Sequence, residues 1–176
     1  GRAISDFVND HLSNWYVRLN RKRFWQGGLT EDKLSAYQTL YTCLETVAKL
    51  MAPIAPFYAD QLFCDLISVT GREQVYSVHL SDFPVCQEAL IDKNLEERMQ
   101  MAQTISSMVL ALRRKVNIKV RQPLHILMVP VLDEHQKESI EAVKQLILNE
   151  VNVKDMKFVD NTAGILVKRI KPDFKK

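Results

Sequence analysis

The stretch "LRRKVNIKVRQPLHILMVPV", residues 112–131, contains the point at which a helical pattern gives way to an extended one. Before Asn117, apolar residues recur every three or four positions, as on one face of an α-helix. After it, residues 124–131 form a short apolar run of the kind found in buried strands. The change predicts a helical domain over residues 1–117 and a small α/β unit over residues 118–176.

Upstream of this change, the apolar spacing predicts four helices. The first ends at a glycine pair, and the second is bounded by a capping threonine and the proline-rich segment "MAPIAP". An aspartate is suited to cap the fourth helix. The boundaries and caps are residues 2–25, Thr30 to "MAPIAP", residues 57–69, and Asp92 to Lys115. Helices of this length can bury a common core, so we expect a mostly α fold built on a four-helix bundle.

Downstream of the change, the expected order is β-α-β-β. The first strand is followed by an amphipathic helix over residues 133–149, and two extended runs come after it, "VKDMKFVD" and "ILVKRIK". This order predicts a small α/β appendage to the helical bundle.

Composition describes an ordinary globular chain without a membrane anchor. Of the 176 residues, 47% are hydrophobic and 26% are charged, and the apolar runs are too short to span a bilayer. The N-terminus lacks the apolar core of a signal peptide. Cys43, Cys64 and Cys86 are too far apart for a C-x-x-C site, which favours reduced thiols in a cytoplasmic protein. Because position 1 already reads as helix interior, we expect a piece of a longer protein.

The distribution of charge says more than the net charge of +3. Residues 11–30 contain no acid but four cations, and residues 98–132 again contain no acid, with their cations gathered near the middle. Two acid-free basic segments, far apart in the sequence, indicate a partner that carries negative charge.

In the first segment, a straight α-helix places Asn14, Arg18, Arg21 and Trp25 in one sector about 60° wide. Trp15 instead falls with the apolar stripe, which predicts that it is buried. Guanidinium groups bind phosphate and indoles stack on bases, so this sector suits single-stranded RNA. The alternative is a solvated face with Trp25 tucked against the end of the bundle, and this stretch taken alone favours that alternative.

The second segment strengthens the RNA interpretation. Its cations lie where a helix turns into a strand, and a turning backbone can gather side chains around a phosphate. A solvated helix end, where the helix dipole favours cations, accounts for those within the helix but not for those beyond it. The candidates are Arg113, Arg114, Lys115, Lys119 and Arg121.

No catalytic or metal-binding constellation is recognisable in the sequence. The four histidines are scattered, and none is spaced for metal binding with a cysteine or carboxylate. A glycine-rich phosphate loop and a G-x-S-x-G motif are both missing. We therefore expect no catalytic residue, metal or cofactor in this chain.

Four motifs carry a family resemblance: "LSNWYVRLNRKRFW", "LMAPIAPFYADQLF", "SVHLSDFP" and "KVRQPL". In this order they resemble the anticodon-binding domain of class I aminoacyl-tRNA synthetases for branched aliphatic amino acids. The last motif is similar to the isoleucyl enzymes in particular. Substitutions at Ile54, Asp60-Gln61 and Phe83 depart from the family pattern at core or loop positions.

The resemblance implies part of an isoleucine–tRNA ligase that holds the anticodon stem-loop of isoleucine tRNA. The ATP- and Mg-dependent catalytic fold, with its H-I-G-H and K-M-S-K-S sequences, would lie upstream, so this chain alone should be inactive. The resemblance also implies that RNA meets the helix carrying Arg18 and Arg21 and the junction from Arg113 to Arg121. The alternatives are the valyl or leucyl enzyme and a helical-bundle protein-interaction module.

Overall fold

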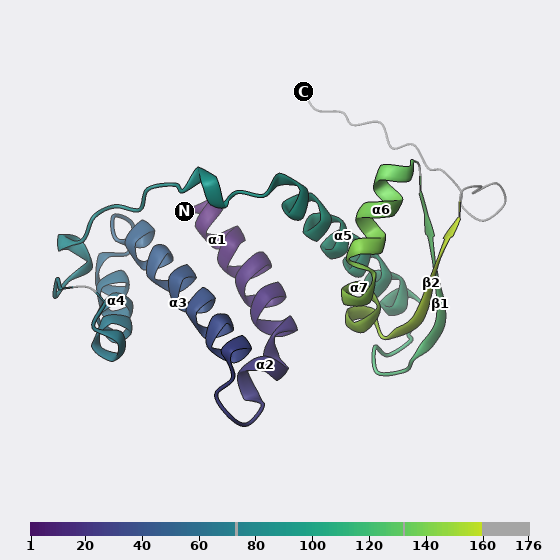
Figure 1. Ribbon diagram of the computed structural model, residues 1–176, viewed down its shortest axis with the longest axis horizontal. Helices are drawn as coiled ribbons and strands as arrows, with labels where there is room; N and C mark the ends of the chain where they lie inside the picture. Colours follow the sequence, from purple (N-terminus) through teal and green to yellow (C-terminus); the bar gives the residue numbers. More distant parts are fainter. Residues whose placement is uncertain (73, 132, 160–176) are drawn as a thin grey trace. The chain divides into compact units, whose positions relative to one another are not determined.

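The computed structural model describes residues 1–72, 74–131 and 133–159. The chain forms two compact units, Gly1–Leu90 and Ile91–Lys176, and each is described by itself (Figure 1). The expected fold class is confirmed, because the structure is mostly α-helical with a small sheet. Among the described residues, no helix combines the length and apolar character needed to cross a membrane.

The N-terminal segment is helical but is not the single regular helix that its spacing predicts. It comprises α1 (Arg2–Asp6), a π-helix, η1 (Phe7–Val17), and α2 (Arg21–Trp25). The chain turns at Asn20, with φ −88° and ψ 7°, and the Asn20 side-chain amide donates to the carbonyl of Tyr16 over 2.9 Å. An asparagine that binds nearby backbone competes with helix continuation, which explains the interruption.

Helix α3 (Glu31–Met51) and helix α4 (Pro56–Thr70) form the centre of the first unit. The predicted cap is confirmed, because the Thr30 hydroxyl accepts a hydrogen bond from the Lys33 amide over 3.2 Å. Ala48 of α3 and Ala59 of α4 are fully buried, so the backbones can approach closely while Phe63 fills the space beside them.

Two short 3₁₀ turns, η2 (Val78–Leu80) and η3 (Glu88–Leu90), lie between the third and fourth helices that the sequence predicts. Asp60 of α4 fixes the first turn, since its carboxylate accepts from the Ser77 hydroxyl over 2.7 Å and from the Val78 amide over 2.9 Å. These two hydrogen bonds lower the pKa of the Asp60 carboxyl.

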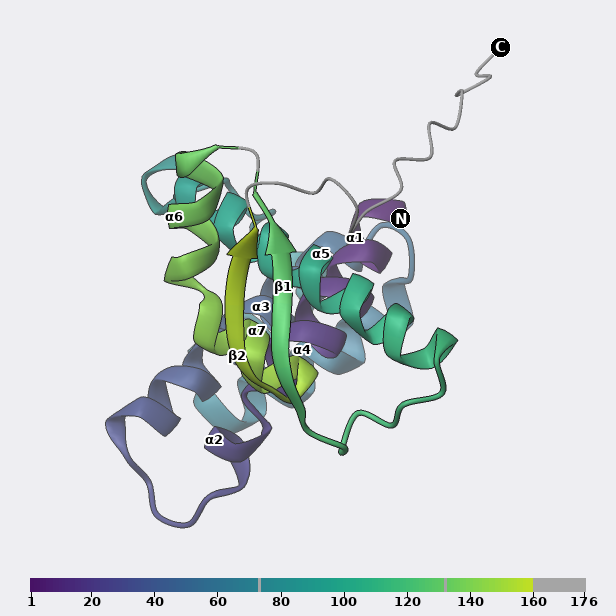
Figure 2. The same cartoon turned by 90° about the vertical axis from the view of Figure 1, so that its right-hand side faces the viewer.

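The second unit begins with α5 (Lys93–Lys115), whose predicted cap at Asp92 is confirmed. The elements that follow are β1 (Leu124–Pro130), α6 (Glu134–Ala142), α7 (Lys144–Val151) and β2 (Val153–Val159). Strands β1 and β2 are parallel, with a register that runs from Leu124 opposite Val153 to Pro130 opposite Val159, and Figure 2 shows them side by side.

Helix α5 was predicted as the fourth helix of a bundle. In the structure it packs on α6 and α7 and lies within the second compact unit. The helix expected over residues 133–149 is interrupted at Val143, where φ is −112°. The strand expected over residues 165–171 lies outside the described residues. The division at residue 117 stays a prediction.

Candidate nucleic-acid interface

The four side chains assigned to one RNA-facing sector are all exposed in the first unit: Asn14, Arg18, Arg21 and Trp25. We call this set the N-terminal basic face. The turn at Asn20 divides this face into two parts. Asn14 lies on η1 and Arg18 directly follows η1, whereas Arg21 and Trp25 lie on α2, so the four residues do not form one straight helical stripe. Trp25 is 84% exposed, so the alternative that it is tucked against the helix end is wrong.

The exposure of Trp25 follows from how α2 packs on α3. Phe24 lies between two tyrosines, with ring centroids 6.3 Å from Tyr16 and 5.1 Å from Tyr37. The Tyr37 hydroxyl also donates to the Phe24 carbonyl over 3.2 Å. With Phe24 fixed inward, the next side chain on the helix is turned about 100° away. The indole of Trp25 is therefore presented to solvent on a supported backbone.

Of the cations in this segment, Arg23 is already neutralised. Its guanidinium donates to both carboxylate oxygens of Asp32, over 2.7 and 2.6 Å, and to the side-chain oxygen of Asn20 over 2.8 Å. This arrangement joins α2 to the start of α3. In contrast, Arg21 and Lys22 are exposed and form no ion pair within the described part of the chain.

The second candidate surface is built where α5 ends. Asn117 adopts the left-handed conformation with φ 57°, and two backbone bonds close the helix: Ile118 N–H to the Arg113 carbonyl and Asn117 N–H to the Arg114 carbonyl. This is the Schellman pattern of helix termination. Residues 116–123, which we call the basic loop, then connect α5 to β1.

Four of the five predicted cations of this segment are exposed: Arg114, Lys115, Lys119 and Arg121. Two lie on the last turn of α5 and two on the basic loop. None of them forms an ion pair with any residue that the structure describes. Unpaired, solvated cations near one loop suit contacts with a phosphate backbone.

The fifth cation, Arg113, needs a correction. Only 3% of it is exposed, and its guanidinium donates to the backbone carbonyls of Lys119, Gln122 and Asn152 over 3.1, 3.0 and 3.0 Å. A phosphate cannot reach a group in this position. We therefore remove Arg113 from the candidate RNA contacts.

The sequence contains a signal for this burial. Arg113 lies four residues after Val109 and eight after Ile105, both buried, so it shares their helix face. Asn152 was missed altogether. It ends α7 in the left-handed conformation with φ 52°, a position at which asparagine is a recognised helix terminator.

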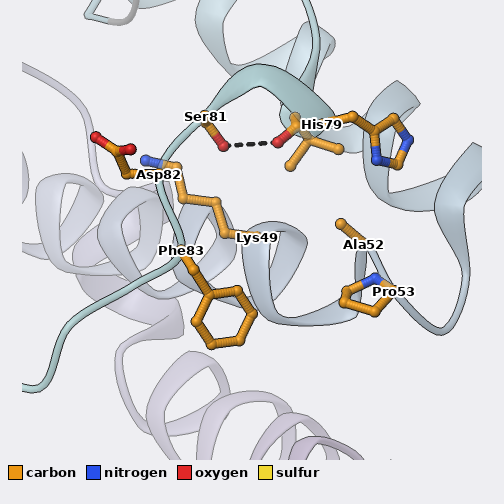
Figure 3. A pocket seen from close by; sticks show the side chains of 8 residues that line it. Lys49, Ala52, Pro53, His79, Ser81, Asp82 and Phe83 are labelled. Carbon is orange, nitrogen blue, oxygen red and sulfur yellow. Dashed lines mark hydrogen bonds between the residues drawn. The ribbon is translucent and has the colours of Figure 1, made fainter.

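A pocket of about 230 Å³ lies between the end of α3 and turn η2 (Figure 3). Lys49 at its wall already pairs with Glu45 over 2.9 Å and lies 5.7 Å from the centroid of the Phe63 ring. In Figure 3, the side chains of His79 and Asp82 lie apart on either side of the turn. No group of three or more metal-ligating side chains occurs in the described ranges.

Comparison with known proteins agrees with the nucleic-acid interpretation. Residues 1–129 match the family described as the anticodon-binding domain of tRNA ligase. The whole chain is 74% identical to the isoleucine–tRNA ligase of Bacteroides thetaiotaomicron and 66% identical to that of Porphyromonas gingivalis. The Dehalococcoides mccartyi enzyme is 45% identical over 88% of the chain.

The chain spans about 15% of the length of these relatives. The matched range, residues 1–129, includes both the N-terminal basic face and the basic loop. The alternative of a protein-interaction module is not favoured, because the match and the relatives all concern tRNA ligases. The chain belongs to the family of anticodon-binding domains of tRNA ligases.

Proposed function

We propose that the chain binds the anticodon stem-loop of isoleucine tRNA as part of a longer isoleucine–tRNA ligase. One observation carries the proposal: each acid-free segment presents exposed cations that form no ion pair with a described residue. They are Arg21 and Lys22 in the first segment, and Arg114, Lys115, Lys119 and Arg121 in the second. Lys and Arg at such sites displace the counterions of phosphates, which supplies most of the affinity for a nucleic acid. The preference for isoleucine tRNA rests on the names of the relatives.

Each surface has a distinct part in this proposal. Lys119 and Arg121, with Arg114 and Lys115 before them, contact the RNA backbone and position it. On the N-terminal basic face, Arg21 offers a bidentate phosphate contact and Trp25 offers a plane on which an unpaired loop base stacks. Backbone contacts hold the stem-loop, and the stacked base adds affinity through its contact with the indole face.

The attachment of isoleucine to tRNA, with ATP and Mg, belongs in this proposal to a catalytic part of the ligase outside the chain. The described residues do not fit that chemistry, since they contain neither a cluster of metal ligands nor a glycine-rich phosphate loop. We place the ligase in the cytoplasm, where thiols such as Cys43 stay reduced.

The salt dependence of tRNA binding tests the proposal. In the full-length ligase, Lys119→Gln should reduce the slope of log affinity against log salt by about 0.7 to 0.9, the value of one phosphate contact. Lys154→Gln is the matched control, because Lys154 is an exposed lysine of the same unit on β2. Affinity should be measured by filter binding at several salt concentrations.

Three results would contradict the proposal or one of its parts. Equal slopes for Lys119→Gln, Lys154→Gln and the unchanged protein would remove the basic loop from the interface. Binding that is insensitive to salt would indicate an apolar docking surface for a protein instead. A change in anticodon preference at constant slope would mean that Lys119 reads a base rather than a phosphate.

A further inference from the structure

Arg113 is a buried cation that pairs with no acidic side chain among the described residues. It is 3% exposed, and the sequence from residue 98 to residue 132 contains no acid. Burial of a charge is costly unless hydrogen bonds compensate it. Here the three bonds to carbonyls compensate in part, and the nearby C-terminus of α5 favours a positive charge. An arrangement with this cost is expected to have a use.

The three carbonyls identify that use, because they connect separate pieces of backbone. Those of Lys119 and Gln122 belong to the basic loop, and the third, of Asn152, belongs to the turn between α7 and β2. The Lys119 carbonyl also accepts from the Gln122 amide over 3.0 Å. Arg113 thus holds both ends of a tight turn whose middle residue pair includes Arg121.

Asn152 completes the arrangement from the other side. Its side-chain amide donates to the Val120 carbonyl over 2.9 Å, and its own carbonyl also accepts from the Leu124 amide over 3.2 Å. In the left-handed conformation of Asn152, its backbone carbonyl and its side-chain amide can both form hydrogen bonds to this part of the chain. Three carbonyls of the loop, those of Lys119, Val120 and Gln122, therefore face inward, while the side chains of Lys119 and Arg121 are exposed.

We propose that Arg113 and Asn152 are positioning residues for tRNA, which hold the basic loop in the shape that presents Lys119 and Arg121 to phosphate. This inference rests on the proposed function. A loop that is fixed before binding loses less conformational freedom when the RNA binds. Arg113 and Asn152 therefore add affinity for the RNA without contacting it. Turning the carbonyls inward also keeps their partial negative charge away from phosphate.

Asn152→Gly in the full-length ligase tests this inference. Glycine tolerates the left-handed conformation, so the substitution removes the side-chain bond to Val120 and keeps the turn. Gln145→Ala is the control, because it removes a side-chain amide bond of similar length in the same unit, 2.9 Å to Asn149 on α7, that does not involve the basic loop. We expect Asn152→Gly to weaken tRNA binding roughly 2- to 10-fold, the range of one hydrogen bond, and to leave the salt slope unchanged. The control should bind normally.

A double-mutant cycle separates positioning from general stability. Replacing Lys119 and Arg121 together by glutamine should weaken binding less in the Asn152→Gly protein than in the unchanged one, because the loop is no longer held. Normal tRNA affinity in Asn152→Gly, with only a lower melting temperature, would overturn the inference. Undiminished effects of the two glutamines in that background would do the same.

The design distinguishes this inference from the proposed function. If the two glutamine substitutions have no effect even in the unchanged protein, the basic loop does not bind tRNA and the proposed function fails. If they do weaken binding but Asn152→Gly does not, only the positioning role fails. Arg113→Lys provides a second variant: it keeps the charge but not the forked geometry, so it should reproduce the loss of affinity at a normal salt slope.

Discussion

Two tryptophans ten positions apart differ in exposure to solvent: Trp15 is buried and Trp25 is exposed. Trp15 is 8% exposed and Trp25 is 84% exposed. The apolar spacing predicted the burial of Trp15, and the structure confirms it. The indole N–H of Trp15 has no hydrogen-bond partner among the described residues, so its stabilising contribution comes from packing rather than from polar contacts.

We expect the two residues to separate stability from binding. Trp15→Ala should cost about 3 to 5 kcal/mol of unfolding free energy, because it leaves a cavity in the core. Trp25→Ala should change stability by less than about 0.5 kcal/mol, as is usual for exposed positions. It should reduce tRNA affinity by about 1 to 3 kcal/mol if a base stacks on the indole. Urea unfolding and tRNA titration of both variants provide the measurements.

Arg18→Ala, at an exposed position of the same segment, is the control for stability in this experiment. A large loss of stability in Trp25→Ala with normal tRNA binding would show that the indole has a structural role. Normal stability in Trp15→Ala would contradict its place in the core.

Arg113 shows where residue-level reasoning from the sequence fails. An arginine in an acid-free basic stretch is expected at the surface, and its neighbours Arg114 and Lys115 are indeed exposed. The spacing of Arg113 from the buried Ile105 and Val109 fits the inner face, but the carbonyls that make burial tolerable come from the following loop and from Asn152, 39 positions away. Residue type and spacing gave conflicting indications, and only the tertiary contacts decide between them.

At the scale of elements, local signals succeeded at helix starts and failed inside two predicted helices, which the structure interrupts at Asn20 and Val143. Thr30 and Asp92 cap α3 and α5 as predicted, because a cap depends only on the next three residues. The turn at Asn20 was not predicted. It contains no glycine or proline, and it depends on the Asn20 side chain binding the backbone while Arg23 reaches Asp32.

Asp60 joins two elements and makes their association depend on pH. Its pKa is lowered by the hydrogen bonds from Ser77 and Val78, so its contribution to stability is present above the usual carboxyl pKa of about 3.9. It is lost as the pH falls through the lower pKa of the folded state. We expect Asp60→Asn to unfold with a weaker pH dependence than the unchanged chain below about pH 4.

Thermal melting between neutral and acidic pH measures this effect. Asp82→Asn is the control, since Asp82 lies just after the same turn and is exposed. It should retain the pH dependence of the unchanged chain. If Asp60→Asn and Asp82→Asn give the same pH profile, the hydrogen bonds of Asp60 do not contribute to acid stability.

At the scale of the whole molecule, the sequence predicted the kinds of element better than their partners. The change of pattern after Asn117 marks the end of α5 correctly. The apolar face of α5, however, fits any apolar partner, so its periodicity could not reveal that it packs on α6 and α7. The chain divides into its two compact units between Leu90 and Ile91, and the domain division at residue 117 stays a prediction.

We expect the chain by itself to form no isoleucyl-adenylate. The sequence contains no glycine-rich loop for the phosphates of ATP, and such a site is needed to orient them. Isoleucine-dependent exchange of pyrophosphate into ATP should therefore stay at background for the 176-residue chain. The full-length ligase, assayed in parallel, should show exchange. Clear activity of the isolated chain would place a nucleotide site within it.

The bond between Arg113 and Asn152 has a consequence for the order of events during synthesis. Its two partners are 39 positions apart, and β1 also acquires its parallel neighbour only after the intervening helices. A ribosome releases α5 well before Asn152 emerges. Until Asn152 and the start of β2 leave the exit tunnel, the nascent basic loop thus lacks two contacts: the bond from Arg113 to the Asn152 carbonyl and the bond from the Asn152 side chain to Val120. A chain interrupted within α7 should contain every cation of the basic loop, but the loop should not yet have its final shape. We therefore expect the ability to bind RNA to arise late in translation.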